Sequence, residues 1–284
     1  MSERKKVTIR TLFNKVAKDE PISWLTCYDY PTAYFQEEAG IDMILVGDSL
    51  GMTMLGYDST LPVTMNDMIR HTQAVRRGAP NVFLVGDMPY MSYQPSVETA
   101  IRSAGRFMAE ASCDSVKLEG GAEMASRIEG IVNSGIPAIG HLGLTPQSAA
   151  ALGGFRVQGR GAAQAKKIID DAKALERAGA FAILLEMVPD RVSKIITERA
   201  EDCIIMSLGS GTDAHGQLLI YHDMFGLYPK FKPKMAKVFG NAGEVILNGL
   251  TQYSKEVKDG AFPQPENWFT IKDEDYNQLL DLLD

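Results

Sequence analysis

The amino-acid sequence predicts a (β/α)₈ barrel that forms one domain over residues 1–284. Short apolar segments rich in β-branched residues alternate with amphipathic segments, which predicts right-handed βαβ units and a parallel sheet. The apolar segments are nearly continuous rather than alternating, as expected for strands that are covered on both faces. Eight such units fit a chain of 284 residues, and an open, doubly wound sheet is the alternative.

Each expected strand is a short apolar segment that ends in a glycine or a polar turn. The eight segments are residues 23–28, 43–47, 82–86, 115–118, 138–140, 182–185, 203–206 and, with the weakest pattern, 218–221. Helices are expected at residues 14–20, 66–78, 96–111, 122–134 and 162–178. Gly40, Gly135 and Gly179 stand where helices should end, which is the usual position of a left-handed residue.

The C-terminal segment, at about residues 263–284, contains prolines followed by an acidic stretch. Within it, Tyr276, Leu279, Leu280 and Leu283 have the spacing of an amphipathic helix. We expect this short helix to dock on the barrel or on a neighbouring subunit.

Composition limits the possible classes of function. The formal net charge is −7, which argues against a nucleic-acid backbone as the main partner, because such partners need clustered Lys and Arg. Cys27, Cys113 and Cys203 are an odd set without CxxC spacing, as expected of reduced, buried thiols. The N-terminal residues lack the apolar segment of a secretory signal, and no apolar run is long enough to span a membrane. We therefore expect a cytoplasmic protein without a membrane partner.

Polar side chains follow nearly every expected strand. They are Asp48, Ser49, Asp87, Lys117, Glu119, His141, Glu186 and Ser207. In a (β/α)₈ barrel, the C-terminal ends of the strands converge on one mouth, which carries the active site. Packing alone does not explain why groups that bind metals or move protons recur at these positions. The sequence therefore predicts an enzyme.

Asp48, Asp87 and Glu119 are predicted to bind one divalent cation. Carboxylate oxygens are the ligands of Mg²⁺, with Mn²⁺ as the second candidate, and no His or Cys residues have the spacing of a zinc site. Without a cation, carboxylates crowded at the mouth would repel one another. The alternative is that each aspartate caps the helix that follows its strand.

Lys117, Glu186 and His141 are the other charged or titratable candidates. Lys117 lies two residues before Glu119, so both point to the same side of the strand, where Lys117 would meet a substrate carboxylate. Glu186 ends an apolar strand, and partial desolvation would suit it to act as a general base. An ion pair between Glu186 and a neighbouring Arg or Lys is the alternative. His141 is either a catalytic or a structural histidine.

The segment GGFRVQGRG, with Arg156 and Arg160, is rich in glycine. It is interpreted either as an ordered loop over an anionic ligand or as part of a subunit interface. Neither this segment nor GDSLG matches a Walker loop or a GxGxxG fingerprint, so a nucleotide site is not predicted.

The chain contains the long block VGDSLGMTMLGYDSTLPVTMNDMIRHTQAVRRGAPNVFLVGDMP, followed by VKLEGG, GHLGLTPQS, GGFRVQGRG, LLEMVP and HDMFG. With these motifs in this order, the sequence resembles the ketopantoate hydroxymethyltransferase (3-methyl-2-oxobutanoate hydroxymethyltransferase) family from about Val7 to Phe269. The resemblance implies a barrel of the phosphoenolpyruvate mutase/isocitrate lyase kind, assembled as a homodecamer.

The resemblance also implies an activity. A hydroxymethyl group would be transferred from 5,10-methylenetetrahydrofolate to 3-methyl-2-oxobutanoate, which gives 2-dehydropantoate in the first committed step toward pantothenate. By matching motifs, Asp48 and Asp87 resemble Mg²⁺ ligands, and Glu119 completes the site directly or through water. Ser49, Asp87 and Lys117 resemble the contacts to the 2-oxo acid, with Asp48 and His141 beside them, and Glu186 resembles the proton acceptor.

Three places depart from the family pattern. SLGSG, with Ser207 and Ser210, replaces a GIGAG-like turn after the seventh strand. His215 stands where aspartate is common, and Asn267-Trp268 replaces a frequent His-Ser pair. Because of these departures, the family pattern does not predict the contacts around the seventh-strand loop. The predicted metal ligands and base are retained.

Two other functions compete with hydroxymethyl transfer. A lyase or mutase of the same superfamily would also bind a 2-oxo acid on Mg²⁺, but the long GDSLG-containing block favours the transferase. A catalytically silent barrel that serves as a scaffold is expected to have lost part of the carboxylate set or the base, and the sequence keeps both.

Overall fold

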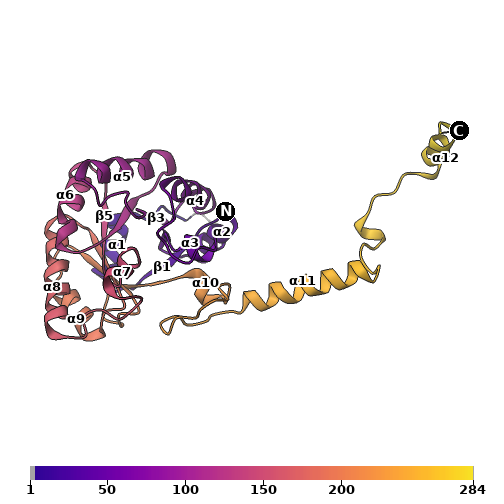
Figure 1. Cartoon of the computed structure of the whole chain (residues 1–284). Coiled ribbons are helices and arrows are strands. Elements are labelled where there is room, and N and C mark those ends of the chain that lie inside the picture. Colours follow the sequence, from indigo (N-terminus) through magenta and orange to yellow (C-terminus); the bar gives the residue numbers. More distant parts are fainter. Residues whose placement is uncertain (1–3, 284) are drawn as a thin grey trace.

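The computed structural model describes residues 4–283 and contains a closed barrel of eight parallel strands (Figure 1). The strands are β1 (Ile22–Thr26), β2 (Met43–Val46), β3 (Phe83–Asp87), β4 (Ser115–Glu119), β5 (Ala138–Gly143), β6 (Ala182–Glu186), β7 (Ile204–Leu208) and β8 (Gly216–Leu219). Consecutive strands pair in parallel, and β8 pairs with β1 to close the barrel. The predicted architecture is confirmed, and the open-sheet alternative is wrong.

Most helices lie around the outside of the barrel, whereas α11 and α12 extend away from it (Figure 1). The α-helices are α1 (Ile9–Val16), α2 (Tyr30–Glu38), α3 (Leu50–Thr53), α4 (Met65–Gly78), α5 (Val97–Ala111), α6 (Ala125–Asn133), α7 (Ala149–Leu152), α8 (Ala162–Arg177), α9 (Asp190–Arg199), α10 (Tyr221–Met224), α11 (Ala242–Lys258) and α12 (Asp273–Asp281). Three short 3₁₀ helices are η1 (Ala122–Met124), η2 (Pro146–Ser148) and η3 (Pro265–Asn267).

The helices expected at residues 66–78, 96–111, 122–134 and 162–178 are confirmed as α4, α5, η1 with α6, and α8. Capping side chains and glycines determine where these helices begin and end. Ser96 caps α5 by accepting a hydrogen bond from the backbone of Thr99 at 3.1 Å. Gly40, Gly135 and Gly179 have φ angles of 78°, 82° and 94°, so the predicted left-handed positions after helices are also confirmed.

Two sequence-based expectations are wrong in detail. The helix expected at residues 14–20 is α1, which begins earlier because Thr8 and Thr11 form a capping box at its start. The weakest strand, expected at residues 218–221, begins at Gly216, and Tyr221 already opens α10. The long helix α11 was not expected at all.

The barrel has two apolar layers. Its interior is filled by large side chains that point inward from the strands, including Ile22, Trp24, Met43, Leu45, Phe83, Val85, Ile139, Leu184 and Met206. A second layer lies between the strands and the surrounding helices. Helix α1 joins the inner layer through Leu12, which is fully buried. This helix therefore covers the N-terminal end of the barrel, and the opposite end carries the polar residues.

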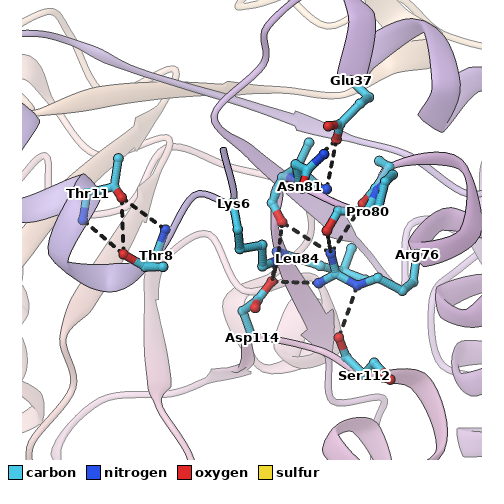
Figure 2. Close-up of polar contacts among 12 residues, drawn as sticks. Lys6, Thr8, Thr11, Glu37, Arg76, Pro80, Asn81, Leu84, Ser112 and Asp114 are labelled. Atoms are coloured by element: carbon cyan, nitrogen blue, oxygen red, sulfur yellow. Dashed lines mark hydrogen bonds and ion pairs between the residues drawn. The ribbon is translucent and has the colours of Figure 1, made fainter. Parts of the chain in front are cut away.

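A network of charged side chains fixes the N-terminal segment beside β3 (Figure 2). Asp114 accepts hydrogen bonds from Lys6 Nζ at 2.6 Å, from Arg76 Nη2 at 2.5 Å and from the Leu84 backbone at 2.8 Å. Lys6 also donates to the Val82 carbonyl oxygen at 2.6 Å. The network satisfies backbone groups at the start of β3 and holds the covered end of the barrel in place.

The outer faces of β1 and β8 are less covered than those of the other strands. Strands β2 to β7 are buried at nearly every position. In contrast, Ser23 and Leu25 of β1 are only partly buried, Gln217 of β8 is exposed, and Leu219 is partly buried. These two strands therefore present an outer face that the described chain leaves partly open.

Helix α11 contains no buried residue and carries an exposed apolar stripe. Val245 is 72 % exposed, Leu247 63 %, Leu250 62 % and Tyr253 58 %. Helix α12 also has no buried residue. The expectation that the C-terminal helix docks on its own barrel is therefore wrong, and docking on a neighbouring subunit remains a prediction.

All three cysteines are buried free thiols, as expected. Burial raises the pKa of the Cys27 thiol to about 12, which makes it a poor nucleophile. Among residues 4–283, no helix combines the length and the apolar character needed to cross a membrane.

Candidate active site

A cavity of about 1010 Å³ opens at the C-terminal ends of the strands. All seven predicted site residues line it, namely Asp48, Ser49, Asp87, Lys117, Glu119, His141 and Glu186. Ser49 is partly buried, and the other six are buried. The alternation of strands and turns therefore gathers residues from five strand ends into one place.

Asp48 and Asp87 are joined directly. The pairing of β2 with β3 brings Gly86 beside Val46, and the backbone N–H of Asp48 donates to Asp87 Oδ2 at 3.0 Å. Neither carboxylate caps the helix that follows its strand, because α3 has no side-chain cap and α5 is capped by Ser96. The capping alternative is thus wrong for both aspartates.

Gln147 connects Asp48 to Glu119. Its Nε2 donates to Asp48 Oδ2 at 2.9 Å, and its backbone N–H donates to Glu119 Oε2 at 3.0 Å. Tyr93 supports the arrangement by donating its hydroxyl to Gln147 Oε1 at 2.8 Å. These hydrogen bonds consequently hold the two carboxylates in fixed orientations.

Lys117 lies within the carboxylate cluster. Its Nζ is 2.9 Å from Asp87 Oδ1 and 3.7 Å from Glu119 Oε1, which confirms that Lys117 and Glu119 share one side of β4. Burial alone would lower the pKa of Lys117, but the neighbouring carboxylates raise the pKa above its ordinary value. Lys117 is therefore a permanent positive charge in the site.

The three carboxylates carry more negative charge than one lysine neutralises. Burial is the main cause that raises the pKa of Asp48 to about 6 and the pKa values of Asp87 and Glu119 to about 7, and repulsion among them adds to it. Glu119 Oε1 is buried and accepts no hydrogen bond from any residue in the described range. Such a set of hard oxygen donors fits a divalent cation in charge and chemistry.

The side chains are not arranged as a closed metal-binding set. Among residues 4–283, no three His, Cys, Asp or Glu side chains already converge on one point as metal ligands. Lys117 lies between Asp87 and Glu119, which accounts for part of this. Cation binding would therefore require a local shift of Lys117 or of a carboxylate, or water between the ion and Glu119.

His141 links this cluster to Glu186. Its Nδ1 is 3.2 Å from Lys117 Nζ, and its Nε2 is 3.1 Å from Glu186 Oε2. Burial lowers the pKa of His141 to about 4, with the positive charge of Lys117 as the next cause. No Arg or Lys in the described chain pairs with Glu186, so the ion-pair alternative for this glutamate is wrong.

The serines that depart from the family pattern brace the backbone around Glu186. Ser210 Oγ donates to the Leu185 carbonyl oxygen at 2.8 Å and accepts from the Val188 N–H at 3.0 Å. Ser207 Oγ in turn accepts from the Ser210 N–H at 3.1 Å. The seventh-strand loop is thus fixed by hydroxyl groups of this chain.

Several residues of the site were not singled out from the sequence. Gln147 lies in the motif GHLGLTPQS and Tyr93 in a proline-rich loop, and nothing local signals their contacts with strands β2 and β4. Tyr28 is a further case, since its hydroxyl lies 2.7 Å from Ser49 Oγ. Arg156 and Arg160 are exposed and do not line the cavity, so a direct role of these arginines over an anionic ligand is not supported, although Phe155 and Val157 do line it.

Residues 6–265 match the family model described as ketopantoate hydroxymethyltransferase. The chain belongs to the ketopantoate hydroxymethyltransferase family. A protein named 3-methyl-2-oxobutanoate hydroxymethyltransferase from Clostridium botulinum (strain Langeland / NCTC 10281 / Type F) is 51 % identical over 272 residues, which cover 96 % of this chain and 98 % of the relative. A protein of the same name from Syntrophus aciditrophicus (strain SB) is 49 % identical over 270 residues, 94 % of this chain and 98 % of the relative.

Solved structures that resemble this member of the ketopantoate hydroxymethyltransferase family confirm the fold. A 2,3-dimethylmalate lyase, described as a PEP mutase/isocitrate lyase superfamily member, has a TM-score of 0.60 and 13 % identity, with 92 % of this chain and 91 % of that chain covered. A phosphonopyruvate hydrolase complex with oxalate and Mg²⁺ has a TM-score of 0.57 and 12 % identity, with 91 % and 93 % covered. The far higher identity to the hydroxymethyltransferases identifies the chain as an enzyme of that family and disfavours the scaffold and lyase alternatives.

Proposed function

We propose that the chain transfers a hydroxymethyl group from 5,10-methylenetetrahydrofolate to 3-methyl-2-oxobutanoate and produces 2-dehydropantoate. The observation that carries this proposal is that one cavity contains two groups of side chains, one suited to hold a cation and a substrate carboxylate and the other suited to remove a proton. A carboxylate–lysine cluster lies on one side, and Glu186 lies on the other, joined by His141. Family membership selects this reaction among those open to a 2-oxo acid.

Asp48 and Asp87 would hold Mg²⁺, with Mn²⁺ as the second candidate, and Glu119 would complete the site directly or through water. The raised pKa values of the three carboxylates support this assignment, because a cation would relieve their repulsion. When bound, the ion supplies Lewis acidity to the 2-oxo and carboxylate groups of the substrate. Ser49 and Lys117 would contact the same acid from the walls of the cavity.

Glu186 would act as the general base and remove the proton from C3 of the 2-oxo acid. The neutral ring of His141, 3.1 Å away, would keep the carboxylate of Glu186 oriented. C3 would then attack the methylene carbon of the folate and form the new C–C bond, while the bond from that carbon to N10 breaks and N10 takes up the proton removed from C3. Water would then displace N5 from the same carbon, leaving the hydroxymethyl group on the product and a proton on N5, which releases tetrahydrofolate.

An exchange experiment tests the first half of this reaction. The enzyme, Mg²⁺ and 3-methyl-2-oxobutanoate are incubated in D₂O without folate, and loss of the C3 proton signal is followed by NMR. Glu186→Gln is expected to slow exchange by about 10²–10⁴-fold, the usual contribution of a general base. EDTA is expected to stop exchange until Mg²⁺ is restored.

Glu198→Gln is the matched control, because the side chain of Glu198 is 62 % exposed on α9. This variant should exchange the C3 proton at the wild-type rate. The proposal is wrong if the wild-type enzyme neither exchanges the proton nor forms 2-dehydropantoate when 5,10-methylenetetrahydrofolate is supplied. Cleavage of a 2-oxo acid adduct without folate would favour the lyase alternative instead.

The enzyme is also proposed to be a homo-oligomer, and the family resemblance implies a homodecamer. The exposed apolar stripe of α11 supports this proposal, since exposed apolar patches of this kind mark interaction surfaces. The outer faces of β1 and β8 are incompletely covered in the same chain. A second copy that places its helix α11 against these strands would satisfy both surfaces.

We assign the enzyme to the cytoplasm. Three buried, free cysteines without a disulfide support a reducing compartment. The substrates named above are small molecules, and the net charge of −7 gives no support for a nucleic-acid partner.

A further inference from the structure

The cavity as a whole is larger than a 2-oxo acid requires. Pockets of about 300–1,000 Å³ hold drug-sized ligands, and this cavity has about 1010 Å³. Beyond the charged cluster, its lining is mainly apolar or aromatic, and includes Phe155, Val157, Leu218, Ile220, Tyr228, Phe231, Pro233 and Met235. We call this the outer compartment. It has the character of a site for a flat ligand with apolar faces.

Asp223 is the acidic residue of the outer compartment, and Lys234 is the basic one. Asp223 is only partly buried, yet its carboxylate has no hydrogen bond and no ion pair with any residue from 4 to 283. Burial is the cause that raises the pKa of Asp223 to about 6. A half-buried carboxylate without a partner at the wall of a cavity is suited to accept hydrogen bonds from a ligand.

The position of Asp223 is fixed by its neighbours in α10. The Tyr221 backbone N–H donates to Thr26 Oγ1 at 3.0 Å and ties the start of the helix to β1. The His222 ring packs 5.3 Å from the ring of Tyr28, whose hydroxyl in turn contacts Ser49. Asp223 is therefore held in a defined relation to the proposed site of the 2-oxo acid.

We propose that the outer compartment binds the pterin ring of the folate co-substrate and that Asp223 accepts hydrogen bonds from its 2-amino group and N3–H. This inference rests on the proposed function. The two N–H groups lie side by side on one edge of the ring, and the two oxygens of a carboxylate match such a pair. The aromatic and apolar walls would cover the faces of the ring.

The exposed lysines around Phe231 agree with a pterin ring whose 2-amino edge faces Asp223. Lys230, Lys232 and Lys234 are exposed within the segment YPKFKPK, in a chain whose overall charge is negative. The glutamate tail of folate carries carboxylates and leaves the pterin on the side away from the aminopyrimidine edge. The tail would extend past these lysines while the pterin edge contacts Asp223.

Ligand discrimination tests the contact between Asp223 and the pterin. Isothermal titration calorimetry under anaerobic conditions measures the Kd of tetrahydrofolate and of its 2-desamino-2-methyl derivative. The wild-type enzyme is expected to bind the derivative about ten- to a hundredfold more weakly, the usual effect of losing a charge-assisted hydrogen bond. Asp223→Asn and Asp223→Ala should bind tetrahydrofolate more weakly and should lose most of this discrimination.

Asp213→Asn is the matched control, because Asp213 is an exposed aspartate that lies 3.9 Å from Lys194. It should discriminate between the two ligands as the wild type does, and thermal unfolding reports whether each variant is folded. Equal discrimination by the wild type and both Asp223 variants would overturn the inference. Because binding is measured without turnover, that outcome is separate from a failure of proton exchange, which would overturn the proposed function.

Discussion

His141 Nε2 lies 3.1 Å from Glu186 Oε2, and this contact joins the proposed general base to the carboxylate–lysine cluster. On the other side of the imidazole, Lys117 Nζ donates to Nδ1 at 3.2 Å. Because burial lowers the pKa of His141 to about 4, the ring is neutral near neutral pH. With Nδ1 as acceptor, the ring proton is on Nε2, the nitrogen that lies 3.1 Å from Glu186 Oε2. We therefore propose that His141 is a positioning residue.

Replacing His141 by asparagine should therefore impair proton removal by Glu186. We expect the rate of C3 proton exchange to fall about 10–100-fold, as is usual when a supporting contact is lost. The KM for the 2-oxo acid should change little, because the histidine acts through Glu186 and not on the substrate. Exchange kinetics measured over a range of substrate concentrations separate the two parameters. A raised KM with an unchanged maximal rate would argue against the positioning role.

The buried carboxylates predict a pH-dependent stability of the metal-free enzyme. Folding raises the pKa of Asp87 from 3.8 and that of Glu119 from 4.5, in each case to about 7. Between these values the folded protein holds protons that the unfolded protein has released, so the contribution of these groups to stability falls as pH rises. His141, with its lowered pKa, opposes this trend only below its ordinary value of 6.5.

Differential scanning fluorimetry with EDTA or with Mg²⁺ measures this effect. The metal binds deprotonated carboxylates, so the increase in Tm caused by Mg²⁺ should be larger at about pH 8 than at about pH 5. The same increase at both pH values would contradict the assignment of Asp87 and Glu119 to the cation site.

Substitution of the loop residue Ser210 is predicted to lower both the stability of the enzyme and its rate of proton exchange. Ser210→Ala removes the hydroxyl that serves both the Leu185 carbonyl and the Val188 N–H, and it leaves these buried backbone groups without their partner. The free energy of unfolding should fall by about 1–3 kcal/mol, and proton exchange should slow because Glu186 lies between them. Urea denaturation and the NMR exchange assay measure the two quantities. Ser134→Ala, which removes an exposed hydroxyl bond at the end of α6, should change stability by at most about 0.5 kcal/mol.

The apolar stripe of α11 predicts how assembly can be broken. Leu250 is 62 % exposed in the single chain, and Leu250→Asp should place a charge in the proposed interface between subunits. Light scattering coupled to size-exclusion chromatography should then show a smaller species than in the wild type. Lys255→Asp, at an exposed and already charged position of the same helix, is the comparison. An unchanged mass for Leu250→Asp would contradict the placement of α11 in the interface between subunits.

The sequence was sufficient for the barrel and for the residues at the ends of its strands. Asp48, Asp87 and Glu186 each follow an uninterrupted apolar run, and parallel strands in a barrel bring such positions together. The contact between Gln147 and Asp48 was not predictable, because it joins residues 99 positions apart through a side chain of the short 3₁₀ helix η2. Helix α11 was missed because Gly243 and Gly249 weaken its helical pattern, and because no partner for its apolar side lies in its own chain.

The projecting helix α11 also has a kinetic consequence. A newly synthesised chain that has closed its barrel still displays Val245, Leu247 and Leu250 to solvent. If only another copy can cover them, the time for which they stay exposed depends on how often two chains meet. Completion of the native state would then be a second-order process, and dilution would favour loss of chains to proteolysis before assembly.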